Sequence, residues 1–451
     1  MAGQPNLLVI HTDQQSCWTL GCYGGTVVDT PHIDRLAAEG ARFGNFFTNS
    51  ALCTPSRGCF LTGRYPTRHG AYANNIPLHR DEITFAEVLR RAGYRTGYVG
   101  KWHLDGDPRP GWVHPERSMG FEDARYMFNR GHWKKIEDFP MNKKKDQPVV
   151  YPYSVIGDEE TYATDWLTGK TLEFLDADDD RPFCHMLSLP DPHDPVHVRP
   201  PYDRLFDPEK MPLPRTFRPE ALPDWAQALQ AESPFGTAQP DREARLRRFL
   251  ALYYGEVKLI DDSVGRILAR LEEKGALDRT IVVFTTDHGE YAGEHGLRAK
   301  NLLYETAYRI PLVIRWPGGI RAGARIDRVF GAVDFQPTIL GLMGVAACGR
   351  EDGRDGSALL RGEPVAWEDA AYLHHCSHTR AGIFTERYEL ALVRDGDSIL
   401  FDRVHDPDQV RNLYRDPALA DVVSGLSGRV RRHHEELGTP SVAWLREEQT
   451  P

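Results

Sequence analysis

The stretch NLLVIHTD, residues 6–13, indicates the fold class of this 451-residue chain. It is a continuous apolar run that ends in an acid, a pattern typical of a strand buried on both faces of a sheet. Similar runs follow at residues 94–100, 181–189 and 280–287. We therefore predict four buried strands spread along the chain.

Helical periodicity fills the intervals between these strands. Apolar residues recur at helical spacing in residues 31–40, 84–93 and about 243–275. Residues 191–241 are rich in proline and charge and are expected to form long loops over the sheet. Strands alternating with helices imply an α/β fold, with a mostly parallel sheet between helices. The positions expected to be buried in the long helix are Leu252, Val257, Ile260, Val264, Ile267, Leu268 and Leu271.

The C-terminal part follows a different pattern. Residues 387–404 have the alternation of a β-hairpin that turns at 395–397, and a helical stretch follows near 418–437. We predict a large α/β domain at residues 1–350 and a small α+β subdomain with an antiparallel sheet at residues 351–451.

Composition restricts the class of protein. A hydrophobic share of 41%, with 10% aromatic residues, supports a substantial core. The formal charge of −10 argues against nucleic acid and anionic membranes as partners. The chain lacks an apolar run long enough to cross a bilayer, and its first residues do not resemble a secretory signal. Seven scattered cysteines, an odd number, do not suggest a disulfide framework, so a cytoplasmic location is expected.

Candidate metal ligands follow two of the predicted strands. Asp13 and Gln14 come at the end of the first, and Asp287 and His288 at the end of the last. Ligands bind at the carboxyl ends of parallel strands, so these residues can meet there. Three oxygen donors and one imidazole suit Ca²⁺ or Mg²⁺. Each Asp taken alone could equally cap a turn or a helix.

Cationic and titratable residues follow the strands in the same way. Lys101 and His103 come after the second strand, His193 after the third, and Lys300 shortly after the fourth. Lysines facing a metal suit an oxyanion whose charge must be held while a bond breaks. A single surface lysine is usually only solvated. Here that interpretation is weakened, because all four residues lie at the same kind of place.

Two motifs connect these residues to a known family. The segment CTPSRGCFLTGR (53–64) resembles the first signature of the formylglycine-dependent (type I) sulfatases, and GYRTGYVGKWH (93–103) resembles the second. The PHDP loop at 192–195 and the segments at 303–318 and 401–417 match the same family in order. The resemblance implies an alkaline-phosphatase-like core and a sulfuric ester hydrolase.

The resemblance also assigns a task to Cys53. It implies that a formylglycine-generating enzyme reads Pro55, Ser56 and Arg57 and oxidises Cys53 to formylglycine. A thiol is poorly suited to attack a sulfate ester beside a hard cation, whereas a hydrated aldehyde has two geminal hydroxyls. One would attack sulfur, and the other would collapse to the aldehyde and expel sulfate. The alternative is a buried structural cysteine at the start of a helix.

The remaining site residues are assigned by the same resemblance. It implies that Arg57 stabilises the ionised hydroxyl and that Lys101 and Lys300 hold the sulfate oxygens. His193, with Lys300, would protonate the leaving alcohol, and His103 would take a proton as the aldehyde reforms. The implied metal is divalent, with Ca²⁺ expected and Mg²⁺ or Mn²⁺ as alternatives; its implied ligands are Asp13, Gln14, Asp287 and His288.

Two of these ligands depart from the common sulfatase pattern. Many sulfatases have a second acid in place of Gln14 and an asparagine in place of His288. Both changes resemble relatives that cleave phosphonate monoesters or phosphodiesters. Hydrolysis of those esters is therefore the alternative activity, and a non-catalytic protein that binds sulfated ligands is a third hypothesis.

Three loops are candidates for contact with the substrate, which is expected to be a sulfated carbohydrate or another small organic sulfate. They are residues 72–78, 128–135 and 197–202, whose aromatic and amide groups suit sugars but equally suit loop packing. Arg380 could reach the site from the small subdomain or form an interdomain salt bridge. The number of subunits, including a homo-oligomer, stays open. The candidate contacts in the loops are Tyr72, Asn74, Asn75, His132, Trp133 and His197.

Overall fold

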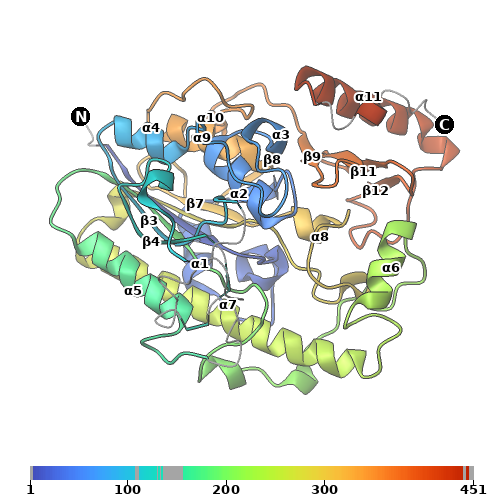
Figure 1. Cartoon of the computed structure of the whole chain (residues 1–451), viewed down its shortest axis with the longest axis horizontal. Coiled ribbons are helices and arrows are strands. Elements are labelled where there is room, and N and C mark those ends of the chain that lie inside the picture. The colour runs from blue at the N-terminus through green and yellow to red at the C-terminus, as the bar shows by residue number, and fades with distance from the viewer. Residues whose placement is uncertain are drawn as a thin grey trace.

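Two β-sheets organise the protein (Figure 1). The computed structural model describes residues 4–106, 111–129, 131–132, 134–135, 156–439 and 443–445. The large sheet has eight strands in the spatial order β4-β3-β5-β1-β6-β7-β2-β8. Its strands are β1 Asn6–Thr12, β2 Ala41–Phe47, β3 Arg95–Lys101, β4 Asp123–Phe128, β5 Phe183–Ser188, β6 Thr280–Thr286, β7 Leu312–Arg315 and β8 Ala324–Gly331.

The large sheet is mostly parallel, as predicted. Only β7 runs against its neighbours, β6 and β2. The four predicted strands are β1, β3, β5 and β6, which are adjacent in the order β3-β5-β1-β6 and mutually parallel. Their carboxyl ends therefore lie at one edge of the sheet, which brings together residues up to 286 positions apart in sequence.

Helices cover both faces of this sheet (Figure 1). Strand β1 shows the reason: Leu7 and Val9 point to one hydrophobic core, and Leu8 and Ile10 to another. The first core contains side chains from α2 Cys53–Thr62, α4 Phe85–Arg91, α9 Phe335–Leu342 and α10 Ser357–Leu360. The second contains side chains from α1 Pro31–Glu39, α5 Ala163–Asp176 and α7 Arg242–Glu273.

The long predicted helix is α7, and six of its seven expected positions are buried. Leu252 is the exception, since it is only half-buried against a smaller cluster near Tyr202. The loop region at 191–241 also contains a helix, α6 Asp224–Glu232, which the weak periodicity did not predict. The other short helices are α3 Pro66–His69 and α8 Glu305–Tyr308.

The small sheet is antiparallel, as predicted, in the order β12-β11-β10-β9. Its strands are β9 Ala371–His374, β10 Arg380–Phe384, β11 Tyr388–Val393 and β12 Ile399–Asp402. Helix α11 Ala420–Glu436 packs on one face through Val423, Leu426 and Val430.

The domain boundary expected at residue 350 stays a prediction. Among the described residues, none of the helices combines the length and apolar character that a bilayer span requires.

Candidate functional site

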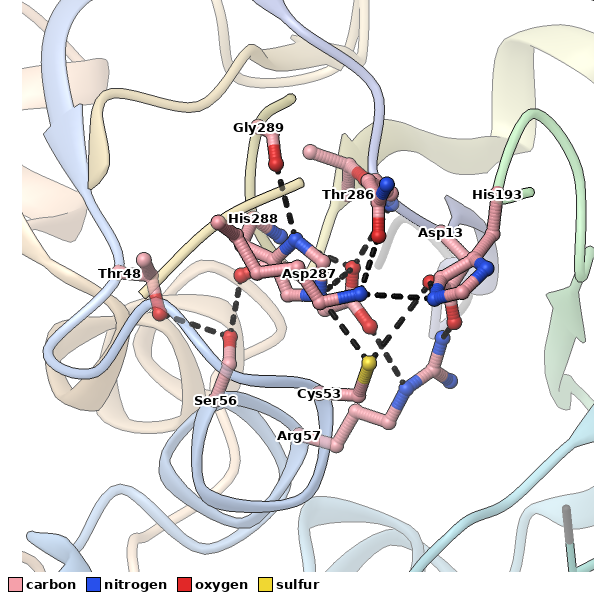
Figure 2. Close-up of polar contacts among 12 residues, drawn as sticks. Asp13, Thr48, Cys53, Ser56, Arg57, His193, Thr286, Asp287, His288 and Gly289 are labelled. Atoms are coloured by element: carbon pink, nitrogen blue, oxygen red, sulfur yellow. Dashed lines mark hydrogen bonds and ion pairs between the residues drawn. The ribbon is translucent and has the colours of Figure 1, made fainter. Parts of the chain in front are cut away.

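Cys53 is the first residue of α2, which points its N-terminus at the carboxyl edge of the large sheet (Figure 2). The Ser56 hydroxyl donates to the main-chain oxygen of Asp287 at 2.5 Å, which ties the helix to the end of β6. The Thr54 amide donates to Asn74 Oδ1 at 3.1 Å. These bonds hold Cys53 Sγ 3.1 Å from His288 Nε2 and 3.8 Å from Asp13 Oδ1.

Arg57 lies one helical turn after Cys53 and connects the ends of four strands, β1, β3, β5 and β6. Its guanidinium donates to Asp13 Oδ2 at 2.8 Å and to Asp287 Oδ2 at 3.0 Å. It also donates to the Lys101 main-chain oxygen and to the Ser188 hydroxyl. The side chain is only 1% exposed, so both carboxylates have a charged partner inside the protein. Such bonds to a buried guanidinium fix the carboxylates in position.

Three of the four predicted metal ligands, Asp13, Asp287 and His288, lie together with Cys53. Donor atoms of Asp13, Cys53, Asp287 and His288 are all within 4.8 Å of one another, and all four side chains are buried. The His288 Nδ1 atom donates to the Gly289 oxygen at 3.0 Å, which leaves the Nε2 lone pair directed at the cluster. Two carboxylates and an imidazole with this tautomer fit a divalent cation.

Gln14 reaches the same cluster, but its side chain is already engaged. Its Oε1 accepts a hydrogen bond from Lys300 Nζ, and its Nε2 donates to Glu290 Oε2. Its backbone has a φ of 63°, in the left-handed region that non-glycine residues rarely adopt. The Gln14 side chain thus joins Lys300 to Glu290, and its main-chain N–H donates to Asp287 Oδ1 at 3.0 Å.

The predicted catalytic lysines and histidines surround this cluster. Lys101 Nζ donates to Asp13 Oδ2 at 2.5 Å, and Lys300 Nζ lies 2.7 Å from His193 Nε2. His193 Nε2 is itself 4.0 Å from Asp13 Oδ1. The main-chain oxygen of His103 accepts from the Thr54 hydroxyl at 2.9 Å, which places this residue beside the start of α2.

Burial and charge set the protonation states. Burial and the charge of Asp13 raise the pKa of the Cys53 thiol to about 11, so the unmodified side chain is uncharged at neutral pH. Burial alone would raise the pKa of Asp13, but Lys101 and Arg57 hold it well below its ordinary value. Burial, followed by the charge of its neighbours, lowers the pKa of His193. The site therefore combines an unionised Cys53 thiol, an ionised Asp13 carboxylate and a neutral His193 imidazole.

The candidate substrate-contacting residues do not share one environment. His132 lies in the site, where its Nε2 is 2.7 Å from Lys101 Nζ. Tyr72 is 38% exposed and lies against His378. His197 is half-buried, and its amide donates to Glu256. The Arg380 guanidinium lies 5.6 Å from the centre of the Trp225 ring. Trp133 lies outside the described residues.

Two buried charged groups that hold loops of the site, Glu290 and Lys134, were not predicted from the sequence. Glu290 accepts from Gln14 Nε2 and from the amides of Ala292 and Ala299, so it holds the loop that carries Lys300. Lys134 lies 2.6 Å from carboxylates of both Asp191 and Glu256. Glu290 had a signal in the sequence, since it stands three residues after Asp287 in TTDHGE. The Lys134 cluster had none, because its partners are distant in sequence.

Comparison with known families agrees with this geometry. Residues 5–345 match the sulfatase family, and residues 293–436 match the family described as N-sulphoglucosamine sulphohydrolase, C-terminal. The first match alone covers most of the chain and contains all the residues that surround Cys53 in the site.

Individual relatives match over most of their length, and solved structures share the fold. An ulvan-active sulfatase of Formosa agariphila is 30% identical, over 96% of this chain and 82% of that protein. An N-acetylglucosamine-6-O-sulfatase of Bacteroides thetaiotaomicron is 30% identical, over 91% and 83%. A structure solved with its substrate D-glucosamine-2-N,6-O-disulfate has a TM-score of 0.80 at 25% identity, covering 98% and 100%. A phosphonate monoester hydrolase of Agrobacterium radiobacter has a TM-score of 0.77 at 26% identity, covering 95% and 96%.

Proposed function

The chain belongs to the sulfatase family, and we propose that its strand-end site cleaves sulfate monoesters of a sulfated saccharide. The observation that carries this proposal is the position of Cys53, within 4 Å of both an imidazole and a carboxylate of the metal-ligand cluster. Relatives named for sulfated glucosamine and ulvan support a saccharide substrate.

The family uses a divalent metal and a formylglycine. We propose Asp13, Gln14, Asp287 and His288 as the metal ligands and Ca²⁺ as the ion, with Mg²⁺ or Mn²⁺ as alternatives. A bound cation would polarise the ester and lower the pKa of a hydroxyl beside it. Arg57 supports this arrangement, because its bonds to both aspartates hold them in position.

Cys53 is the proposed nucleophile after oxidation by a formylglycine-generating enzyme. Hydrated, it supplies one hydroxyl to attack sulfur and a second whose collapse expels sulfate. The pKa of about 11 explains why the unmodified thiol is unsuitable, since very little thiolate exists at neutral pH. In the proposed mechanism His103 accepts the proton released at that collapse.

Two lysines and one histidine hold the substrate and its proton. Lys101 and Lys300 bind the sulfate oxygens as negative charge shifts during cleavage. His193 Nδ1 donates to the Asp194 main-chain oxygen at 2.7 Å, so its Nε2 is the nitrogen that faces Lys300. The proton taken up by the leaving alcohol is therefore held between Lys300 Nζ and His193 Nε2.

The test is release of sulfate by protein produced together with a formylglycine-generating enzyme. We expect turnover of 4-nitrophenyl sulfate and of N-acetylglucosamine 6-sulfate, and a mass for the Cys53 peptide that matches the aldehyde or its hydrate. Cys53→Ala should abolish turnover while the melting temperature is retained. Cys59→Ala, in the same buried helix, is the matched control and should stay active. Near-normal turnover by Cys53→Ala would contradict the proposal.

Phosphonate monoester or phosphodiester hydrolysis is the second candidate activity. Gln14 favours it, because a neutral amide places less negative charge around the cation than a carboxylate would, and His288 shares the resemblance to those relatives. A comparison of kcat/KM for matched phenyl sulfate and phenyl phosphonate esters separates the two activities. A preference for the phosphonate would reverse the assignment, and tight binding of sulfated sugars without turnover would favour a non-catalytic role.

A further inference from the structure

His132 lies inside the site, although the mechanism above assigns it no task. Its ring stacks on that of His193, with ring centres 3.6 Å apart and an interplanar angle of 6°. Its Nε2 lies 2.7 Å from Lys101 Nζ, and His193 Nε2 lies 2.7 Å from Lys300 Nζ. An ammonium group can only donate, so each imidazole nitrogen is the acceptor. The two rings form a stacked pair between the two lysines.

A buried ion cluster holds the segment that carries His132. Lys134 is bonded to Asp191 and Glu256 at 2.6 Å each, and all three side chains are at most 1% exposed. Lys134 stands two residues after His132, and Asp191 stands two residues before His193. One buried ion pair therefore connects the two segments that carry the stacked rings. Separating such a pair is strongly unfavourable, so the segments are held in register.

The stack restrains a movement of the His193 ring that its hydrogen bonds allow. The bond from His193 Nδ1 to the Asp194 oxygen sets the tautomer, but a single bond of this kind allows the ring to rock about the bonded nitrogen. A parallel ring at 3.6 Å blocks that movement on one face. The direction in which His193 Nε2 points therefore depends on His132. Small errors in the placement of a reacting group lower rates substantially.

We propose that His132 is a positioning residue for departure of the alcohol, because its ring keeps His193 Nε2 directed at Lys300 Nζ, and the proton that the alcohol takes up is held between these two atoms. The inference rests on the proposed sulfate ester hydrolysis and deepens it. His132 also contacts Lys101, which binds the sulfate group that all substrates share. Loss of that contact would slow every ester equally, whereas loss of His193 orientation would slow mainly the esters of basic alcohols.

The experiment measures kcat/KM for 4-nitrophenyl sulfate, phenyl sulfate and N-acetylglucosamine 6-sulfate, whose leaving groups become progressively more basic. For His132→Ala we expect a loss of less than about threefold with the nitrophenyl ester and about 10- to 100-fold with the sugar ester. His132→Phe keeps a ring that can stack, so its loss should be nearly equal for all three esters. His193→Ala should show the steepest dependence of kcat/KM on the basicity of the leaving group.

His185→Gln serves as the matched control. His185 is a buried histidine whose ring stacks on Phe174, 4.2 Å away, but it lies within β5 and outside the site. This variant should keep the wild-type dependence on the leaving group. Two results would overturn the role of His132 but leave the proposed function standing. One is an equal loss for all three esters in His132→Ala, and the other is the same steep dependence on the leaving group in His132→Phe. A wild-type enzyme that releases no sulfate would overturn both this inference and the proposed function.

Discussion

Two of the regions in which this protein buries titratable side chains are the strand-end site and a histidine junction. At the strand-end site, Arg57 bridges Asp13 and Asp287, and Lys101 also binds Asp13. The histidine junction consists of His374 on β9, His433 and His434 on α11, and Tyr65, which precedes α3. His374 Nε2 lies 2.9 Å from His433 Nε2, and Tyr65 stacks on His374 at 4.6 Å.

The two regions tolerate burial in opposite ways. In the strand-end site, Lys101 and Arg57 hold the pKa of the buried Asp13 well below its ordinary value, so this carboxylate stays charged. At the histidine junction, burial, followed by the neighbouring imidazoles, lowers the pKa of His374 well below its ordinary value. The first arrangement is suited to holding a cation and an anion. The second joins the small sheet to the large domain without charge, and its stability must therefore depend on pH.

Metal removal should have the largest effect of the changes considered, and it should act on the strand-end site rather than on the histidine junction. We expect chelation to reduce sulfate release to the background rate, because the cation supplies several kcal/mol of charge stabilisation to the reaction. The melting temperature should also fall, since a ligand present at about 1,000 times its Kd stabilises by about 4 kcal/mol. Calorimetry and a sulfate assay, before and after adding back Ca²⁺, Mg²⁺ or Mn²⁺, check this. Full activity in chelator would contradict the metal assignment.

Lys101→Ala is expected to have the next largest effect. Removing one cation from the proposed oxyanion site should lower kcat/KM by about 10² to 10³. Steady-state kinetics with an aryl sulfate measure the loss. The control is Lys274→Ala. Lys274 is the exposed C-cap of α7, and its replacement should leave full activity. A loss below about tenfold in Lys101→Ala would mean that the sulfate is held elsewhere.

The histidine junction should lose stability in mild acid. Burial lowers the pKa of His434 to about 4 from an ordinary 6.5. Between these values protons bind the unfolded chain but not the folded one, so the free energy of unfolding decreases as pH falls from 6.5 to 4. One such group accounts for about 3 kcal/mol across that window.

The variant His434→Gln tests this dependence, since its side chain does not titrate. Melting temperatures at pH 7.5, 5.5 and 4.5 should decrease less steeply than in the parent protein. His114→Gln changes an exposed histidine and should leave the slope unaltered. An identical slope in His434→Gln and the parent would show that the junction does not control acid stability.

Arg380→Ala should have the smallest effect. Its guanidinium lies over Trp225, and a cation–π contact at a partly exposed site contributes about 0.5–1 kcal/mol. We expect a small decrease in melting temperature and unchanged kinetics with aryl sulfates. If KM for the saccharide sulfate alone increases about tenfold, Arg380 contacts the sugar, and the small subdomain takes part in the site.

The strands that build the site were predictable because they are buried on both faces. Continuous apolar runs such as β1 and β6 are visible in the sequence without any knowledge of their neighbours. Strand β8, ARIDRVFG, mixes charged and apolar residues, because only part of it is covered. Helix α6 has a short apolar face, which is recognisable only where Trp225 packs in a core with Tyr304.

Part of the site was also predictable, namely the residues that end or follow these strands. Asp13, Lys101 and Asp287 end or follow recognisable strands, so their meeting at one edge follows from a parallel sheet. His132 was expected to contact saccharide, but its stack on His193 depends on a loop position that Lys134 holds through Asp191. Ion pairs between residues so far apart leave no local pattern in the chain.

The sequence by itself determined the strands that end in functional residues, the two sulfatase signatures and the types of chemical group available. Local apolar patterns and short motifs carry that information. The tertiary structure alone decided which buried groups are charged, which imidazoles are neutral and which ring restrains His193. These properties depend on desolvation and on partners from distant segments, and both exist only once the chain has packed.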